Sequence, residues 1–137
     1  MQRSAANSPF YAAWLDTHSA DLDAGVLAVR RRDFARLAEL AEYSCLKMHA
    51  VMMSTRPPLL YWSPATLACQ QEVRALRSRG VPVFYTIDAG PQLKAVCEPA
   101  ALPEVAAALR SVPGVVEVLE SPLGGGARLL ASERSGS

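Results

Sequence analysis

Two short apolar runs joined by a compact turn constrain this chain most. The runs occupy residues 81–85 and 93–97, and residues 86–91 between them read Thr-Ile-Asp-Ala-Gly-Pro. Asp, Gly and Pro are the residues that tight turns favour. Strands joined this closely must be antiparallel, because a parallel pair needs a crossover of about a dozen residues or more. We therefore predict a hairpin with strands at 83–87 and 93–98.

Apolar residues at three- and four-residue steps predict helices in the amino-terminal half. The strongest pattern begins after Asp33, a residue suited to capping a helix, and continues to about Ser54. Ser63, followed by Pro, gives the same kind of start signal. Gly25 interrupts the earliest pattern, which leaves open one bent helix or two. The predicted helices are 9–31, 34–54, 64–79 and 104–111.

Two further apolar segments, 115–119 and 127–131, complete a strand–strand–helix–strand–strand order in the second half. This order predicts an α+β fold of two layers, with an antiparallel four-stranded sheet, a ferredoxin-like core and the long amino-terminal helices packed on it. The length of 137 residues, half of them hydrophobic, suits one domain. We expect that domain to span 1–131 and to be followed by a polar, frayed tail at 132–137.

Composition and charge argue against several functional classes. The net charge is +1 and residues 30–32 form the only dense basic run, so we expect no nucleic-acid partner. No apolar stretch reaches the roughly 18 residues of a membrane span, and no signal-peptide pattern begins the sequence. We expect a cytoplasmic protein without membrane contact. The three cysteines and two histidines lack metal-ligand spacing, so we expect no metal site.

The carboxylate of Asp88 has two interpretations from the residues alone. Asp-Ala-Gly-Pro is ordinary turn chemistry, in which the Asp side chain bonds nearby backbone. Alternatively, a rigid hairpin presents the carboxylate to a bound small molecule, and Gly90 lets the backbone approach it. Both interpretations remain open at this level. His49, near an apolar helix face, is interpreted as structural, and the glycine run 124–126 as a hairpin turn rather than a phosphate loop.

Several segments in a fixed order along the chain together indicate a family. They are Met-His-Ala at 48–50, Arg-Pro-Pro at 56–58, Tyr-Trp at 61–62 and Val-Phe-Tyr-Thr-Ile-Asp-Ala-Gly-Pro at 83–91. This set resembles the carboxy-terminal half of diphosphomevalonate decarboxylases. These enzymes belong to the galactokinase, homoserine kinase, mevalonate kinase and phosphomevalonate kinase superfamily. The resemblance extends from Met1 to about Leu130.

The resemblance implies an activity and a set of site residues. In this family ATP phosphorylates the 3-hydroxyl of mevalonate 5-diphosphate, and loss of phosphate and carbon dioxide then gives isopentenyl diphosphate. Asp88 matches the catalytic aspartate that orients or deprotonates that hydroxyl. Ala89, Gly90 and Met1 match positions that contact substrate. The resemblance also implies ATP and Mg²⁺ as cofactors of the full-length enzyme, and a homodimer.

The sequence departs from the family pattern in two ways. Gln92 follows Pro91, where the family commonly has Asn, which leaves the choice of substrate open. The family's serine- and glycine-rich ATP loop and its substrate-binding arginine do not occur in these 137 residues. We therefore expect the amino-terminal ATP-binding domain to be absent, and the chain alone to be catalytically incomplete and to bind no cofactor.

Three alternatives stay open beside the leading interpretation. The first is a decarboxylase that acts on mevalonate 5-phosphate. The second is a non-enzymatic module that binds a partner or dimerises, which the missing nucleotide loop favours. The third is a kinase of the same superfamily, although those enzymes usually carry a glycine-rich motif where this chain has Asp-Ala-Gly-Pro.

Overall fold

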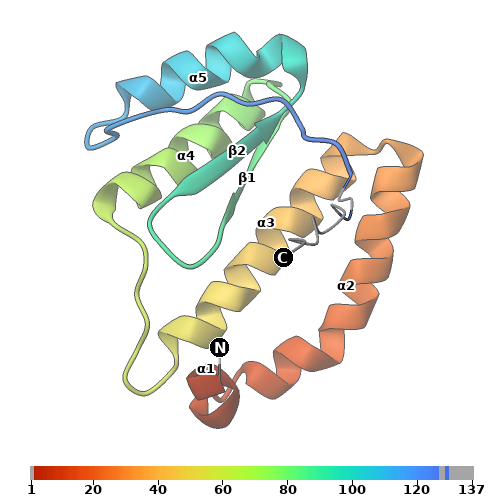
Figure 1. Cartoon of the computed structure of the whole chain (residues 1–137), viewed down its shortest axis with the longest axis vertical. Helices are drawn as coiled ribbons and strands as arrows, with labels where there is room; N and C mark the ends of the chain where they lie inside the picture. Colours follow the sequence, from red (N-terminus) through yellow and green to blue (C-terminus); the bar gives the residue numbers. More distant parts are fainter. Residues whose placement is uncertain (1, 127–128, 130–137) are drawn as a thin grey trace, which may run out of the picture.

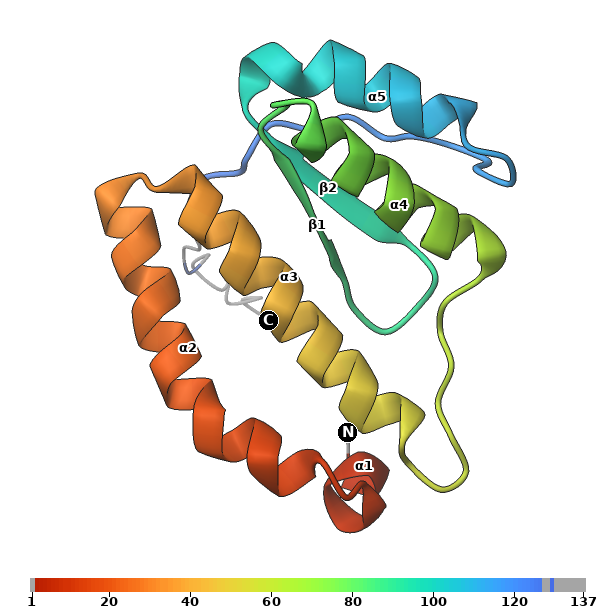
Figure 2. The ribbon, with the colours of Figure 1, turned by 180° about the vertical axis from the view of Figure 1, so that it is seen from behind.

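The computed structural model describes residues 2–126 and 129 and confirms the α+β class (Figure 1). An antiparallel hairpin of strands lies between helix α3 and the helices α4 and α5, and α2 runs alongside α3 (Figures 1 and 2). The elements are α1 (Gln2–Asn7), α2 (Tyr11–Arg31), α3 (Phe34–Met53), α4 (Pro64–Ser78), β1 (Val83–Ile87), β2 (Leu93–Cys97), the 3₁₀ helix η1 (Pro99–Ala101) and α5 (Leu102–Ser111).

The starts of α3 and α4 agree with the prediction, whereas α2 begins at Tyr11, two residues after the predicted start, and has no side-chain cap. The carboxylate of Asp33 accepts a 2.9 Å hydrogen bond from the backbone N–H of Arg36 and begins α3. Ser63 and Thr66 form a reciprocal capping box at the start of α4, with Pro64 as the first helical residue. These side chains satisfy backbone N–H groups that a helix start leaves without partners.

Helices α1 and α2 complete the amino-terminal half. Of the two alternatives left open at Gly25, one helix or two, the structure has one continuous helix, α2. The six-residue α1 was not predicted. The side chain of Asn7 exchanges two hydrogen bonds of 3.1 and 3.0 Å with the backbone of Arg56, which ties α1 to the segment after α3.

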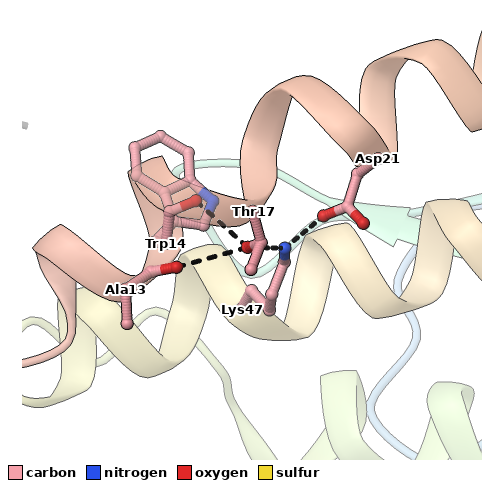
Figure 3. A network of polar contacts seen from close by, with 5 residues as sticks. All are labelled: Ala13, Trp14, Thr17, Asp21 and Lys47. Carbon is pink, nitrogen blue, oxygen red and sulfur yellow. Dashed lines mark hydrogen bonds and ion pairs between the residues drawn. The ribbon is translucent and has the colours of Figure 1, made fainter.

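A lysine on α3 ties this helix to α2 (Figure 3). The ammonium of Lys47 donates to the hydroxyl of Thr17 at 2.7 Å and forms an ion pair with Asp21. The Thr17 hydroxyl in turn lies 3.3 Å from the carbonyl oxygens of Ala13 and Trp14. The α2–α3 pair is therefore joined by a polar contact in addition to its apolar face.

The two strands pair in a simple antiparallel register, with Val83 opposite Cys97 and Ile87 opposite Leu93. Residues 83, 85 and 87 of β1 point toward α4 and α5, and residues 93, 95 and 97 of β2 pack against the same core. The fully or nearly buried members of this core are Cys45, Cys69, Val73, Leu76, Val83, Tyr85, Ile87, Ala101, Val105, Leu109 and Val112.

Helix α3 runs along the edge of β1 and provides polar partners for its backbone. The carboxylate of Glu42 accepts a 3.3 Å hydrogen bond from the N–H of Tyr85. Cys45 Sγ donates to the carbonyl oxygen of Ile87 at 3.5 Å, and Nε2 of His49 lies 3.1 Å from the same oxygen. Residues 42, 45 and 49 share one face of the helix. Side chains therefore take the place that a neighbouring strand would occupy.

The predicted four-stranded, ferredoxin-like sheet is not seen, because the described residues form a two-stranded sheet. Segment 115–119 forms no strand, and Val116 and Leu119 are 99% and 82% exposed. An apolar run becomes a strand only when another strand supplies backbone partners, which local sequence does not reveal. Residues 127–131, expected as the fourth strand, and the tail 132–137 lie outside the described residues except for Leu129.

None of the helices in the described part of the chain combines the length and the apolar character needed to cross a bilayer.

Candidate active site at the β1–β2 turn

Asp88 is the first residue beyond β1 and its carboxylate faces solvent, with 70% of the side chain exposed. Its carboxylate contacts Lys94, the cross-strand partner of Thr86, and so lies on the face of the hairpin opposite to that of Tyr85 and Ile87. The ammonium of Lys94, on β2, lies 2.6 Å from Oδ2 of Asp88. An ion pair this exposed contributes at most about 1 kcal/mol. The carboxylate is therefore free to exchange Lys94 for another partner.

The turn after Asp88 carries no large side chain until Gln92. Ala89 is exposed, and Gly90 has φ of +139°, a conformation that L side chains rarely adopt. A Cβ at Gly90 would also overlap Oε1 of Gln92. The structure thus brings three predicted site residues, Asp88, Ala89 and Gly90, together on one open turn. Met1, the fourth, lies outside the described residues.

Both ends of this turn are held by side chains from the helices. At the β1 end, His49 and Cys45 converge on the carbonyl oxygen of Ile87. At the β2 end, the hydroxyl of Thr66 donates a 2.8 Å hydrogen bond to the carbonyl oxygen of Pro91. The turn sequence did not point to any of these helix residues as part of a site. The signal available was the placement of polar residues 42, 45 and 49 at helical spacing on an otherwise apolar face.

His49 is 1% exposed, as expected for a structural histidine, and it contacts an indole as well as β1. The ring of Trp62 lies 4.7 Å from the imidazole between centroids, and its Nε1 is 3.3 Å from Nε2 of His49. A single ring nitrogen cannot donate to Ile87 and accept from Trp62 at once, so the hydrogen bond to the Ile87 carbonyl requires the proton on Nε2, and Trp62 then makes a ring contact only. Burial lowers the pKa of His49, while the hydrogen bond to Ile87 and the charge of Asp88 oppose that shift.

We expect this lowered pKa to make folding stability depend on pH near 6. Because the unfolded chain takes up a proton at His49 before the folded chain does, stability is full above about pH 6.5 and falls as the pH drops below that value. Urea unfolding midpoints at pH 5.5 and 7.5 measure the effect. The variant His49→Gln is expected to lose much of this pH dependence. His18→Gln, which changes an exposed histidine of α2, should retain it, and equal slopes in both variants would contradict the assignment.

A cleft of about 540 Å³ lies elsewhere, between α2 and α3. Apolar residues of the two helices, including Leu22, Val26 and Leu40, line it. Asp88, Ala89 and Gly90 do not line it. The candidate site is therefore an exposed turn rather than this cleft.

Comparison with known proteins places the chain in a family. Residues 1–125 match the mevalonate 5-diphosphate decarboxylase C-terminal domain. The chain belongs to this decarboxylase family. The resemblance that the sequence segments indicated is thereby confirmed.

Individual relatives of this decarboxylase domain are longer than the chain. The solved mevalonate diphosphate decarboxylase from Enterococcus faecalis is 37% identical, with a TM-score of 0.76 over 80% of this chain and 34% of its own. A structure described as MDDEF in complex with MVAPP, AMPPCP and magnesium is 35% identical, with a TM-score of 0.77 over 82% of this chain and 35% of its own. The phosphomevalonate decarboxylase of Haloferax volcanii is 34% identical over 87 residues, which are 63% of this chain and 27% of the relative. The decarboxylase domain thus spans between about a quarter and a third of these relatives.

Proposed function

We propose that the chain is the substrate-side domain of an ATP-dependent decarboxylase of mevalonate 5-diphosphate, in which Asp88 orients or deprotonates the 3-hydroxyl. One observation carries this proposal: the carboxylate is solvent-facing and directly follows a strand whose last carbonyl is held by buried side chains. Family membership supports the reaction class. The interpretation of Asp88 as a purely structural turn residue is disfavoured, because its carboxylate contacts another side chain rather than turn backbone.

The chemistry of the reaction matches what the turn offers. A tertiary alcohol is a weak nucleophile until a base takes its proton. Phosphoryl transfer otherwise depends on positioning and on charge stabilisation. The small residues Ala89 and Gly90 leave the backbone beside Asp88 open to a substrate. A fixed anion at this position also favours positive charge that develops during loss of carbon dioxide.

The described residues do not fit a magnesium site, because they contain no group of three His, Cys, Asp or Glu side chains that could hold a metal ion. We therefore assign no ligand of ATP or Mg²⁺ to them, and we derive no step through either. A relative's structure holds AMPPCP and magnesium in a chain more than twice as long. We propose that the corresponding nucleotide site lies outside these 137 residues.

The isolated chain is expected to release no phosphate and no carbon dioxide from ATP, Mg²⁺ and mevalonate 5-diphosphate. Alignment of reacting groups supplies about 7–11 kcal/mol in well-oriented systems, and that contribution is missing when the nucleotide is not held. Measured turnover by purified 1–137 would overturn this expectation. A chimera in which the chain replaces the matching third of the Enterococcus faecalis enzyme is expected to be active. A folded but inactive chimera beside an active parent enzyme would contradict the proposed function.

A second substrate is favoured by one observation, the similarity to the phosphomevalonate decarboxylase of Haloferax volcanii. The same chimera assayed with mevalonate 5-phosphate distinguishes the two candidates. Because the chimera combines residues from two enzymes, the ratio of kcat/KM for the two substrates is compared with that of the parent. A shift of this ratio toward the monophosphate would assign that preference to residues of this chain.

A further inference from the structure

We propose that His49 and Thr66 are positioning residues that fix the two ends of the turn carrying Asp88. The inference deepens the proposed function and takes its catalytic meaning from it. It stands on the geometry of four residues, 88–91, between two anchored carbonyl groups.

The first anchor acts through a peptide plane. The carbonyl of Ile87 and the N–H of Asp88 belong to one rigid peptide group. Holding the Ile87 oxygen therefore fixes the direction in which Asp88 leaves the strand. His49 approaches this oxygen at 3.1 Å from a position closed to solvent, so water does not compete for the contact. The indole of Trp62 packs against the same imidazole, with 4.7 Å between the ring centroids, and so restricts the ring.

The second anchor acts at the far end of the turn. Pro91 has no N–H, so its carbonyl is its one polar backbone group. Thr66, which is 3% exposed, donates to that carbonyl at 2.8 Å. Its hydroxyl also accepts from the N–H of Ser63 at 3.2 Å, so the same side chain is part of the α4 cap. The Pro91 end of the turn is thereby tied to a helix terminus.

The contact between Asp88 and Lys94 does not replace these anchors. Both of its side chains are more than half exposed, so it is screened by solvent and adds little rigidity. The buried contacts of His49 and Thr66 fix the backbone of the turn, whereas Lys94 only pairs with the carboxylate of Asp88. A base that must stay within hydrogen-bond reach of a hydroxyl needs a fixed backbone.

Matched variants of the chain itself test the inference by NMR relaxation of the Asp88, Ala89 and Gly90 amides. Thr66→Val removes the hydroxyl at nearly constant shape, and Thr66→Ser retains it. His49→Leu removes the ring nitrogens, and His49→Gln keeps a donor near the position of Nε2. We expect order parameters of the turn to fall from about 0.85 to below 0.6 in the Val and Leu variants, with recovery in the Ser and Gln variants.

Leu40→Ala is the control for a general loss of stability. This residue faces the α2–α3 cleft and contacts neither anchor, so the variant should destabilise the chain without loosening the turn. Wild-type order of the turn in both Thr66→Val and His49→Leu would overturn the inference. Should His49→Leu fail to fold, Thr66→Val decides the question alone, because it tests the second anchor and replaces the threonine by a side chain of nearly the same shape.

A kinetic measurement separates this inference from the proposed function. In the active chimera, Thr66→Val is expected to lower kcat about 10- to 100-fold with little change in KM, because a misplaced base affects the chemical step. An unchanged kcat would refute the positioning role and leave the proposed function standing. Inactivity of the unmutated chimera would speak against the proposed function, and the NMR result would still decide whether the anchors fix the turn.

Discussion

Replacement of Asp88 by Asn is expected to lower the turnover of the active chimera about 10²- to 10⁴-fold, the usual contribution of a general base. The amide has the same shape as the carboxylate but cannot take a proton from the 3-hydroxyl, and it lacks the negative charge. The change lies on an exposed turn, so the fold should be retained. Release of phosphate and of carbon dioxide at saturating ATP and substrate measures the loss.

Glu98→Gln is the matched control for this substitution. Glu98 is exposed and directly follows β2, so the variant removes one carboxylate from the same hairpin at its other end. We expect its turnover to stay within about twofold of the unmutated chimera, in line with a surface change that touches no reacting group. Full activity of Asp88→Asn, or an equal loss in Glu98→Gln, would refute the role proposed for Asp88.

The largest expected effect on stability is that of Glu42→Ala. The carboxylate of Glu42, 8% exposed as a residue, receives two hydrogen bonds from Arg77 at 2.5 and 2.8 Å and one from the N–H of Tyr85 at 3.3 Å. Its removal leaves a guanidinium without its partner and a buried backbone donor unsatisfied. Removing one partner of a buried ion pair lowers the free energy of unfolding by about 3–5 kcal/mol. We expect about 3 kcal/mol for Glu42→Ala, because Arg77 is partly exposed.

Urea unfolding of the chain measures this loss of stability, and two further variants serve as comparisons. Glu42→Gln keeps an acceptor for Tyr85 and is expected to cost less than Glu42→Ala. Glu72→Ala removes a looser pair, in which Arg79 lies 3.8 Å away and both side chains are substantially exposed, so we expect a cost below about 1 kcal/mol. A Glu42→Ala variant no less stable than Glu72→Ala would show that the edge of β1 does not depend on this carboxylate.

Local signals in the sequence predicted those parts of the fold that local chemistry decides. Asp33 and Ser63 mark helix starts because each side chain satisfies N–H groups within three residues. The hairpin was predictable because a short polar turn leaves antiparallel pairing as the only arrangement. Segment 115–119 has the composition of a strand, yet composition alone does not create a partner strand, and the described chain forms none there.

The sequence likewise predicted one part of the candidate site, the turn, and not the side chains that hold it. The turn itself could be located from its Asp, Gly and Pro, and the family resemblance singled out Asp88 within it. Its supports could not be predicted, because they join residues far apart in sequence: His49 and Ile87 are 38 residues apart, and Thr66 and Pro91 are 25 apart. A buried polar side chain and an ordinary helix cap look alike in sequence until the backbone they contact is known.

Because α3 lies along the outer edge of β1, a further strand can be added to the sheet on one side only. On β1 the N–H of Tyr85 and the carbonyl oxygen of Ile87 are taken by Glu42, Cys45 and His49, so an additional strand could not pair with these two groups. In the described part of the chain β2 has one neighbouring strand, and its other edge has no strand beside it. Any strand recruited from a longer polypeptide or from another molecule must therefore be added next to Leu93–Cys97, where it would extend the sheet away from α3.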